Sequence, residues 1–106
     1  MLAELEIIPI GTKSASLSSL LADVAKLIDA SGLDYRIGPM GTVVEGEWDQ
    51  VFGVVNRCLE ALKKDCDRIS CTIKVDYREG PGGRLASKVQ HVQALVNQPL
   101  KTGVAR

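Results

Sequence analysis

Aromatic side chains are scarce in this sequence. Its 106 residues include one tryptophan, one phenylalanine and two tyrosines. Sheets that bind single-stranded RNA stack bases on exposed aromatic side chains, often within a strand motif of the form Lys/Arg-Gly-Phe/Tyr-Gly/Ala-Phe. No such motif is found here, and Phe52 and Tyr77 fall at positions expected to face the core. RNA binding is therefore not expected.

A surplus of charge and a long apolar run are also missing. Acidic and basic residues number 13 each, and this balance argues against general binding to nucleic acids or anionic membranes. No apolar run approaches the ~20 residues that span a bilayer. Glu4 and Glu6 interrupt the start, where a signal peptide would have a basic stretch and then an apolar one. We therefore expect a cytoplasmic protein.

The sequence contains no recognisable catalytic or metal-binding signature. It has no nucleophile elbow, no phosphate-binding P-loop, no zinc-protease motif and no dinucleotide-binding fingerprint. Cys58, Cys66 and Cys71 have neither CxxC nor Cys/His ligand spacing, which favours reduced thiols. The only histidine, His91, has no obvious acidic or thiol partner nearby in the sequence. We expect no catalytic residue, no metal and no required cofactor, and an enzyme has the least support.

The apolar residues that are present follow strand and helix periods in turn. These periods predict strands at 2–10, 35–37, 42–45 and 68–78, and helices at 17–31, 48–64 and 84–96. The order β-α-β-β-α-β-α predicts a ferredoxin-like α+β sandwich with an additional C-terminal helix. We expect one domain over residues 1–96 and a tail, 97–106, that frays or reaches a neighbouring subunit.

The first two helices carry clear local signals. Ser16 is a typical N-cap of the first helix, and Gly32 stands where a left-handed residue ends it. Trp48 continues the apolar stripe of the second helix, so we expect it to be a core or interface anchor. The apolar stripe of the first helix is formed by Leu17, Leu20, Leu21, Val24, Leu27 and Ile28.

The sheet face that the helices leave uncovered is expected to be mixed in character. Glu4 and Glu6 share that face of the first strand, and Lys74 and Asp76 share it on the last. Paired carboxylates are capable of acid–base work, but a salt-bridged sheet face is the favoured interpretation. Such a face is either solvated or packed on a second subunit, and we favour the second subunit.

The stretch GPMGTVVEGEW, residues 38–48, is the best candidate for a binding site. Its glycines let a ligand approach the backbone, and Thr42 and Glu45 offer hydrogen-bonding groups. Trp48 offers a flat face for a cationic ring. These groups suit a small aromatic cation. From the chemistry alone, the favoured alternative is a structural hairpin, shaped by Pro39 and Gly41, that leads into a core tryptophan.

Several motifs taken together resemble the thiamine-binding protein family, the MTH1187/YkoF-like group. They are PIG in the first strand, the serines before the first helix, GPMGTVVEGEWD, RISCTIKVDYR and the later Lys88. The likeness spans residues 2–96 in the same order. It implies a ferredoxin-like fold and homodimers that pair into homotetramers through their sheet faces. It also implies a site for thiamine or its hydroxymethylpyrimidine moiety near the subunit contacts.

The resemblance also implies a set of ligand-binding residues: Thr12, Ser16, Met40, Thr42, Glu45, Lys74 and Arg78. In this hypothesis Glu45 accepts a hydrogen bond from the aminopyrimidine and Met40 packs on a ring. Tyr77 and the loop EGPGG depart from the family pattern. We expect a non-enzymatic small-molecule binding protein. The alternative is an oligomeric structural or regulatory module without a bound ligand.

Overall fold

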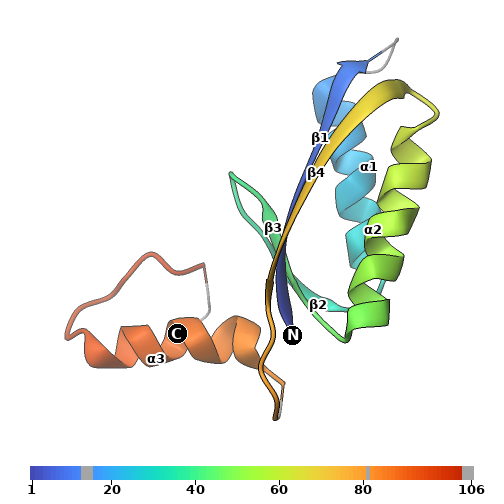
Figure 1. The fold of residues 1–106 in the computed structure, drawn as a ribbon. Helices are drawn as coiled ribbons and strands as arrows, with labels where there is room; N and C mark the ends of the chain where they lie inside the picture. The colour runs from blue at the N-terminus through green and yellow to red at the C-terminus, as the bar shows by residue number, and fades with distance from the viewer. Residues whose placement is uncertain (13–15, 81, 104–106) are drawn as a thin grey trace.

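A four-stranded antiparallel sheet, covered on one face by two helices, forms the body of the molecule (Figure 1). The computed structural model describes residues 1–12, 16–80 and 82–103. The sheet order is β2-β3-β1-β4, which confirms the predicted ferredoxin-like α+β fold. The elements are β1 (Leu2–Thr12), α1 (Leu17–Ala30), β2 (Asp34–Ile37), β3 (Thr42–Glu45), α2 (Trp48–Leu62), β4 (Cys66–Asp76) and α3 (Arg84–Leu95).

The two neighbours of β1 differ greatly in length. β4 pairs with β1 from Leu2 to Thr12, whereas β3 pairs with it only from Leu2 to Leu5. Beyond Leu5, no described strand pairs with β1 on its β3 side. A gap is therefore left at this edge, between β1, α1 and the turn that joins β2 to β3.

The turn between β2 and β3 is a tight hairpin that approaches β1 closely. The Gly38 N–H donates to the Gly41 carbonyl at 2.9 Å. A Cβ added at Gly41 would lie 3.0 Å from the carbonyl oxygen of Leu5, tighter than side chains normally tolerate. Glycine at position 41 therefore lets the hairpin approach β1 without displacing the Leu5 carbonyl.

The core lies between the sheet and helices α1 and α2. β1 and β3 direct alternate residues toward the helices, and Leu5 and Val44 among them are almost fully buried. Residues spaced by three or four face the sheet from each helix. The helix residues in this core are Leu20, Val24, Ile28, Val51, Val54, Val55, Cys58 and Leu62.

The helix α1 begins and ends where the sequence predicts, but two residues of its predicted apolar stripe are exposed. Ser16 is the N-cap and its hydroxyl accepts from the Ser19 N–H at 3.2 Å, while Gly32 has φ 77°. Leu17 and Leu21 remain 51% and 43% exposed. They lie toward the edge of the stripe, where no strand continues the sheet beneath them.

Two predictions of inward-facing side chains are also revised. Trp48, predicted to be a core or interface anchor, is 58% exposed and so is not in the core; as the first residue of α2 it stacks on Phe52, with ring centroids 4.4 Å apart. Tyr77, predicted to face inward, is 73% exposed. The β1–β4 ladder ends at Leu2 and Asp76, so no partner strand extends the inward alternation to Tyr77.

The third helix, α3, lies on the sheet face opposite α1 and α2 (Figure 1). It is the chain itself, and neither solvent nor a second subunit, that covers this part of the open face. Leu85 is buried there, and the Gln93 side chain binds the Gln98 carbonyl and the Leu100 N–H at 2.7 and 2.8 Å. These two bonds tie the start of the predicted tail to α3, and residues 104–106 lie outside the described part.

Among the described residues, no helix is both long enough and apolar enough to cross a membrane.

Two leucines of α1 provide a test of the layer arrangement. Leu20→Ala should lower the free energy of unfolding by about 2–5 kcal/mol, because it opens a cavity beneath a side chain that is only 2% exposed. Leu17→Ala, the same change at an exposed position of that helix, should cost less than about 1 kcal/mol. Urea unfolding at a fixed protein concentration measures both. Equal losses would contradict the assigned face of α1.

Candidate functional site

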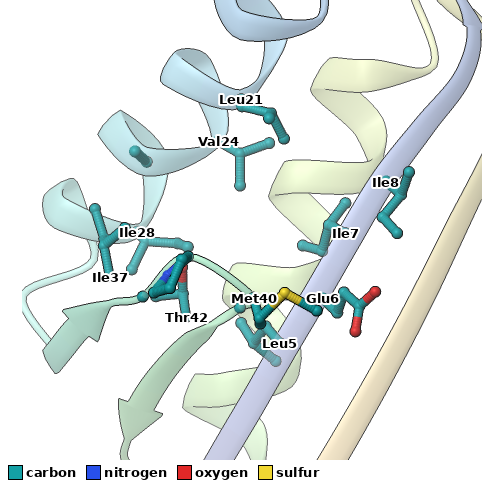
Figure 2. A pocket seen from close by; sticks show the side chains of 14 residues that line it. Leu5, Glu6, Ile7, Ile8, Leu21, Val24, Ile28, Ile37, Met40 and Thr42 are labelled. Carbon is teal, nitrogen blue, oxygen red and sulfur yellow. The ribbon is translucent and has the colours of Figure 1, made fainter.

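A hollow at the open edge of β1 is called here the hairpin pocket (Figure 2). Its volume is about 300 Å³, at the lower end of the range for small-molecule sites. Aliphatic side chains form most of its wall. The lining residues are 5–8 of β1, Leu21, Val24, Ala25 and Ile28 of α1, and 37–42 of the hairpin.

The polar groups of the hairpin pocket come from two strands. Thr42 lines the pocket from β3, on the same sheet face as Leu5, its partner in the register, and Glu6 lines it from β1, with its carboxylate directed away from α1 at the rim of the pocket (Figure 2). Within the described part of the chain, the Glu6 carboxylate makes neither an ion pair nor a hydrogen bond, so the predicted salt bridge of this residue is not formed. Met40 is 80% exposed at the hairpin tip. An apolar hollow with one free carboxylate at its rim suits a flat ring that carries positive charge.

The second hollow, called here the α3 cleft, lies between α3 and the open face of the sheet. Its volume is about 360 Å³. Register places four of its residues in one row across the sheet, from β2 to β4: Arg36, Val43, Glu4 and Lys74. From above this row, α3 contributes Arg84, Leu85, Lys88 and Val89. The cleft is thus much richer in charge than the hairpin pocket.

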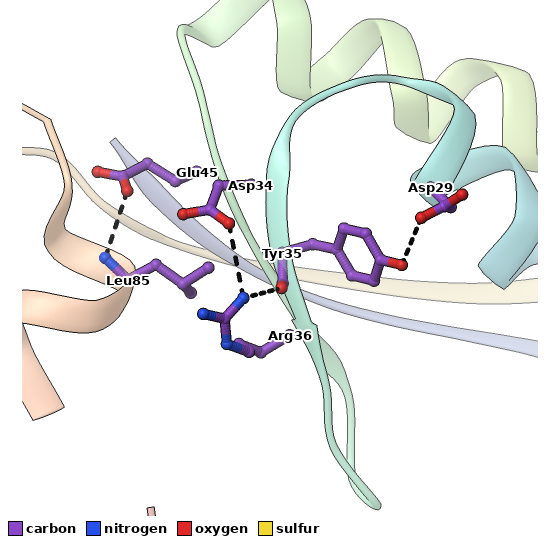
Figure 3. Close-up of polar contacts among 6 residues, drawn as sticks. All are labelled: Asp29, Asp34, Tyr35, Arg36, Glu45 and Leu85. Atoms are coloured by element: carbon purple, nitrogen blue, oxygen red, sulfur yellow. Dashed lines mark hydrogen bonds and ion pairs between the residues drawn. The ribbon is translucent and has the colours of Figure 1, made fainter. Parts of the chain in front are cut away.

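Glu45 holds the beginning of α3. Its carboxylate accepts the N–H of Arg84 at 2.9 Å and that of Leu85 at 3.3 Å (Figure 3 draws the second bond). The N-cap position is Gly83, which has no side chain to serve the exposed N–H groups. A carboxylate from another strand fills that role, and the positive end of the helix dipole favours its charge.

A second carboxylate, Asp76 at the end of β4, holds the next turn of α3 through Lys88. Asp76 and Glu45 both pair in register with Leu2, so they flank it in one row across the sheet. The hydrogen bond and the charge of Lys88 lower the pKa of Asp76, and Arg84 and Arg78 add to this effect. α3 is therefore attached to the sheet by two carboxylates.

The outer strand β2 is attached to α1 by a separate polar contact (Figure 3). The Tyr35 hydroxyl donates to Asp29 at 2.6 Å, and this hydrogen bond raises the pKa of the tyrosine. Arg36 reaches back to Asp34 at 3.5 Å and to the Tyr35 carbonyl at 2.7 Å. These contacts fix the start of the hairpin that closes the pocket.

The seven ligand-binding residues predicted from the sequence are not brought together within one chain. Met40 and Thr42 line the hairpin pocket, whereas Lys74 lines the α3 cleft. Thr42 and Glu45 are three residues apart on β3, so their side chains point to opposite faces of the sheet. One chain therefore does not bring these two side chains together in a single pocket, and the predicted site residues stay a prediction.

The other predicted residues take different places. Ser16 caps α1, and Arg78 follows the end of β4. Thr12 pairs with Cys66, and its side chain lies outside the described part. Glu6 is the pocket residue that the sequence hypothesis did not include. Glu6 lines the pocket because β3 stops pairing with β1 at Leu5. No local sequence pattern predicts that stopping point.

Comparison with known proteins assigns the chain to a group. The sequence profile of a family described as thiamine-binding protein matches residues 3–93. The UPF0045 protein YqgV of Bacillus subtilis is 36% identical over 96 residues, covering 86% of this chain and 92% of that protein. A UPF0045 protein of Methanothermobacter thermautotrophicus is 38% identical over 93 residues, covering 86% and 94%.

Solved structures agree with the fold. A hypothetical protein of Methanocaldococcus jannaschii superposes with a TM-score of 0.76 at 27% identity, covering 87% of this chain and 94% of that one. A protein of Thermotoga maritima, described as a candidate thiamine biosynthesis/salvage protein, gives a TM-score of 0.72 with coverage of 86% and 96%. Its identity is 22%, so this second likeness supports the fold alone.

Removal of the Glu45 carboxylate should loosen α3 without unfolding the sheet. Glu45→Ala leaves the first N–H groups of α3 without an acceptor, which should speed amide hydrogen exchange in α3 about tenfold. Exchange in β1 and β4 should not change. Glu60→Ala, which removes an exposed carboxylate of α2, is the matched control. Faster exchange throughout the sheet, or an unchanged exchange rate in α3, would contradict the capping role.

The attachment of α3 should also depend on pH through Asp76. Folding lowers the pKa of this carboxyl below its ordinary value of 3.8, so its contribution is present above that value and is lost as pH falls through the folded pKa. NMR signals of α3 should therefore shift toward a detached helix on acidification, more steeply than in Asp76→Asn. The same acid response in both proteins would rule out Asp76 as the titrating group.

Proposed function

The chain belongs to the thiamine-binding protein family, and we propose that it binds thiamine or its hydroxymethylpyrimidine moiety in the hairpin pocket. The main support is the free Glu6 carboxylate beside an apolar hollow of about 300 Å³. Thiamine combines a flat aminopyrimidine with a thiazolium cation. The pocket offers groups that complement both parts.

Each side chain has a distinct role in this proposal. Glu6 lies against the thiazolium or accepts from the amino group of the pyrimidine, and a charge-assisted contact of either kind is a strong one. Thr42 supplies a hydroxyl that both donates and accepts. Met40, on the exposed hairpin tip, folds its polarisable thioether over a ring. The aliphatic wall from β1 and α1 then excludes water from the other side.

The proposed activity is binding without turnover. The polar groups of the pocket are few, and they suit recognition of a charged ring better than proton transfer to and from a reacting centre. The three cysteines of the fold are free thiols, which supports a reducing compartment, and we place the protein in the cytoplasm on that basis.

We also propose that the protein assembles as homodimers that pair into homotetramers through their sheet faces. Support comes from large apolar side chains that one chain leaves exposed near the pocket and on α3: Ile8, Leu21, Ile37, Met40, Val92 and Leu95. Because α3 covers only one end of the open face, the part around Ile8 and Ser70 is available for a second copy.

The same exposed apolar surface supports the alternative, an oligomeric structural or regulatory module without a ligand. In that case Met40 belongs to a subunit contact. Met40→Ala would then change the mass measured by light scattering and leave ligand titrations blank. In the binding proposal, it weakens the affinity for thiamine.

Calorimetric titration of thiamine and hydroxymethylpyrimidine tests the proposal. Glu6→Gln keeps the shape of the side chain and removes its charge, so it should weaken thiamine binding about tenfold. The neutral pyrimidine should be less affected if the carboxylate faces the thiazolium.

Glu4→Gln is the control, since Glu4 lies two residues away on the same strand but lines the α3 cleft. Its thiamine affinity should equal that of the unchanged protein. Absence of heat with both ligands on folded protein would refute the binding proposal. An equal loss in the two glutamate variants would remove Glu6 from the site.

A further inference from the structure

Positive charge collects in the α3 cleft. Four of its lining residues are cationic and two are acidic: Arg36, Lys74, Arg84 and Lys88, against Glu4 and Asp76. Arg36 already has Asp34 as a partner at 3.5 Å. The other three cations line the cleft from two elements, Lys74 from β4 and Arg84 and Lys88 from α3.

Asp76 does not neutralise this cluster. Its carboxylate is engaged by Lys88, yet Arg84 and Arg78 are also close enough to lower its pKa. One negative charge therefore lies close to several positive charges and cannot balance them all. Glu4 stands opposite Lys74 in the β1–β4 register, but no ion pair joins them in the described part of the chain. The cluster keeps a local excess of positive charge.

Arg84 supplies a second, independent observation. Its Nε is buried and has no hydrogen-bond partner among the described residues. Buried donors of this kind nearly always have an acceptor in native proteins. The backbone N–H of Arg84 is fixed by Glu45 at 2.9 Å, so the start of the side chain is anchored, and Arg84 is one of the residues that line the cleft. This is a preorganised donor without an acceptor.

We propose that the α3 cleft binds a phosphate-type anion, with Arg84 and Lys74 as its principal ligands. The planar guanidinium presents parallel donors that match phosphate oxygens, and Lys74 adds a compact charge from the sheet. Leu2 and Val43 from the sheet and Leu85 from α3 give the cleft an apolar lining, which suits the organic part of a phosphate ester. The exposed N–H groups of α3 are not the site, because Glu45 already occupies two of them.

This anion site is separate from the hairpin pocket. The two hollows share no lining residue, so the inference does not depend on thiamine binding. The phosphate group has two chemical sources, a free pyrophosphate ion or the ester group of an organic diphosphate. Three ligands tell them apart: inorganic pyrophosphate, thiamine, and thiamine diphosphate.

Calorimetry with inorganic pyrophosphate is the direct test. The unchanged protein should bind it, and Arg84→Gln and Lys74→Gln should each weaken binding about tenfold. Lys63→Gln removes the same charge from the exposed end of α2 and should have no effect. Glu4→Gln removes a carboxylate from the cleft and should strengthen binding about threefold.

The outcomes separate cleanly. Binding of pyrophosphate itself identifies a site for the free anion. If pyrophosphate does not bind, but thiamine diphosphate binds more tightly than thiamine and Arg84→Gln abolishes that difference in affinity, the site takes the ester group. The proposal is overturned if pyrophosphate does not bind to folded protein and thiamine diphosphate binds no more tightly than thiamine, or if Lys63→Gln weakens binding as much as Arg84→Gln. Thiamine binding that persists in that event leaves the proposed function intact.

Because Arg84→Gln affects a residue at the start of a helix, a second measurement is needed. Amide NMR shifts on addition of pyrophosphate should concentrate in α3 and in β4 near Lys74. Shifts confined to the hairpin around Met40 would overturn the location. Lys74→Gln, on an exposed strand position, leaves the helix start unchanged and gives an independent reading of the affinity.

Discussion

The unequal pairing of β1 determines the layout of the molecule. β4 accompanies this strand along its whole length, but β3 stops at Leu5. The close approach of Gly41 to the Leu5 carbonyl fixes that stopping point. Beyond it, the helices cover a sheet with one strand missing on the β3 side, and the apolar hollow beside Ile8 is the result. A longer β3 would fill the gap, bury the edge of β1 and leave no pocket there.

The same short pairing also governs the opposite face. The first row of the β1 register places Glu45 and Asp76 on either side of Leu2. These two carboxylates bind residues near the start of α3. The helix therefore rests on the end of the sheet where all four strands overlap, and leaves the longer, two-stranded end open. The two hollows have different chemistry because one forms at an apolar strand edge and the other over a charged row.

The sequence was informative where local rules decide the structure. Alternation and helical spacing predicted each element, and Ser16 and Gly32 marked the ends of α1. It was less informative where a side chain depends on the reach of a distant strand. Tyr77 follows the alternation of β4, yet its partner strand has already ended. Thr42 and Glu45 appear together in one motif, although the two-residue period of a strand sends them to opposite faces. Glu6 entered the pocket only because β3 is short.

The cap on α3 has a consequence for how the chain folds. The helix begins at a glycine and receives its N-terminal acceptor from a residue about 40 positions earlier. An isolated segment of 12 residues is too short to be a stable helix in water. It gains its acceptor only after β3 has paired with β1, so α3 is expected to form last. The order of synthesis and the order of folding then coincide, and the open face of the sheet stays uncovered until the final step.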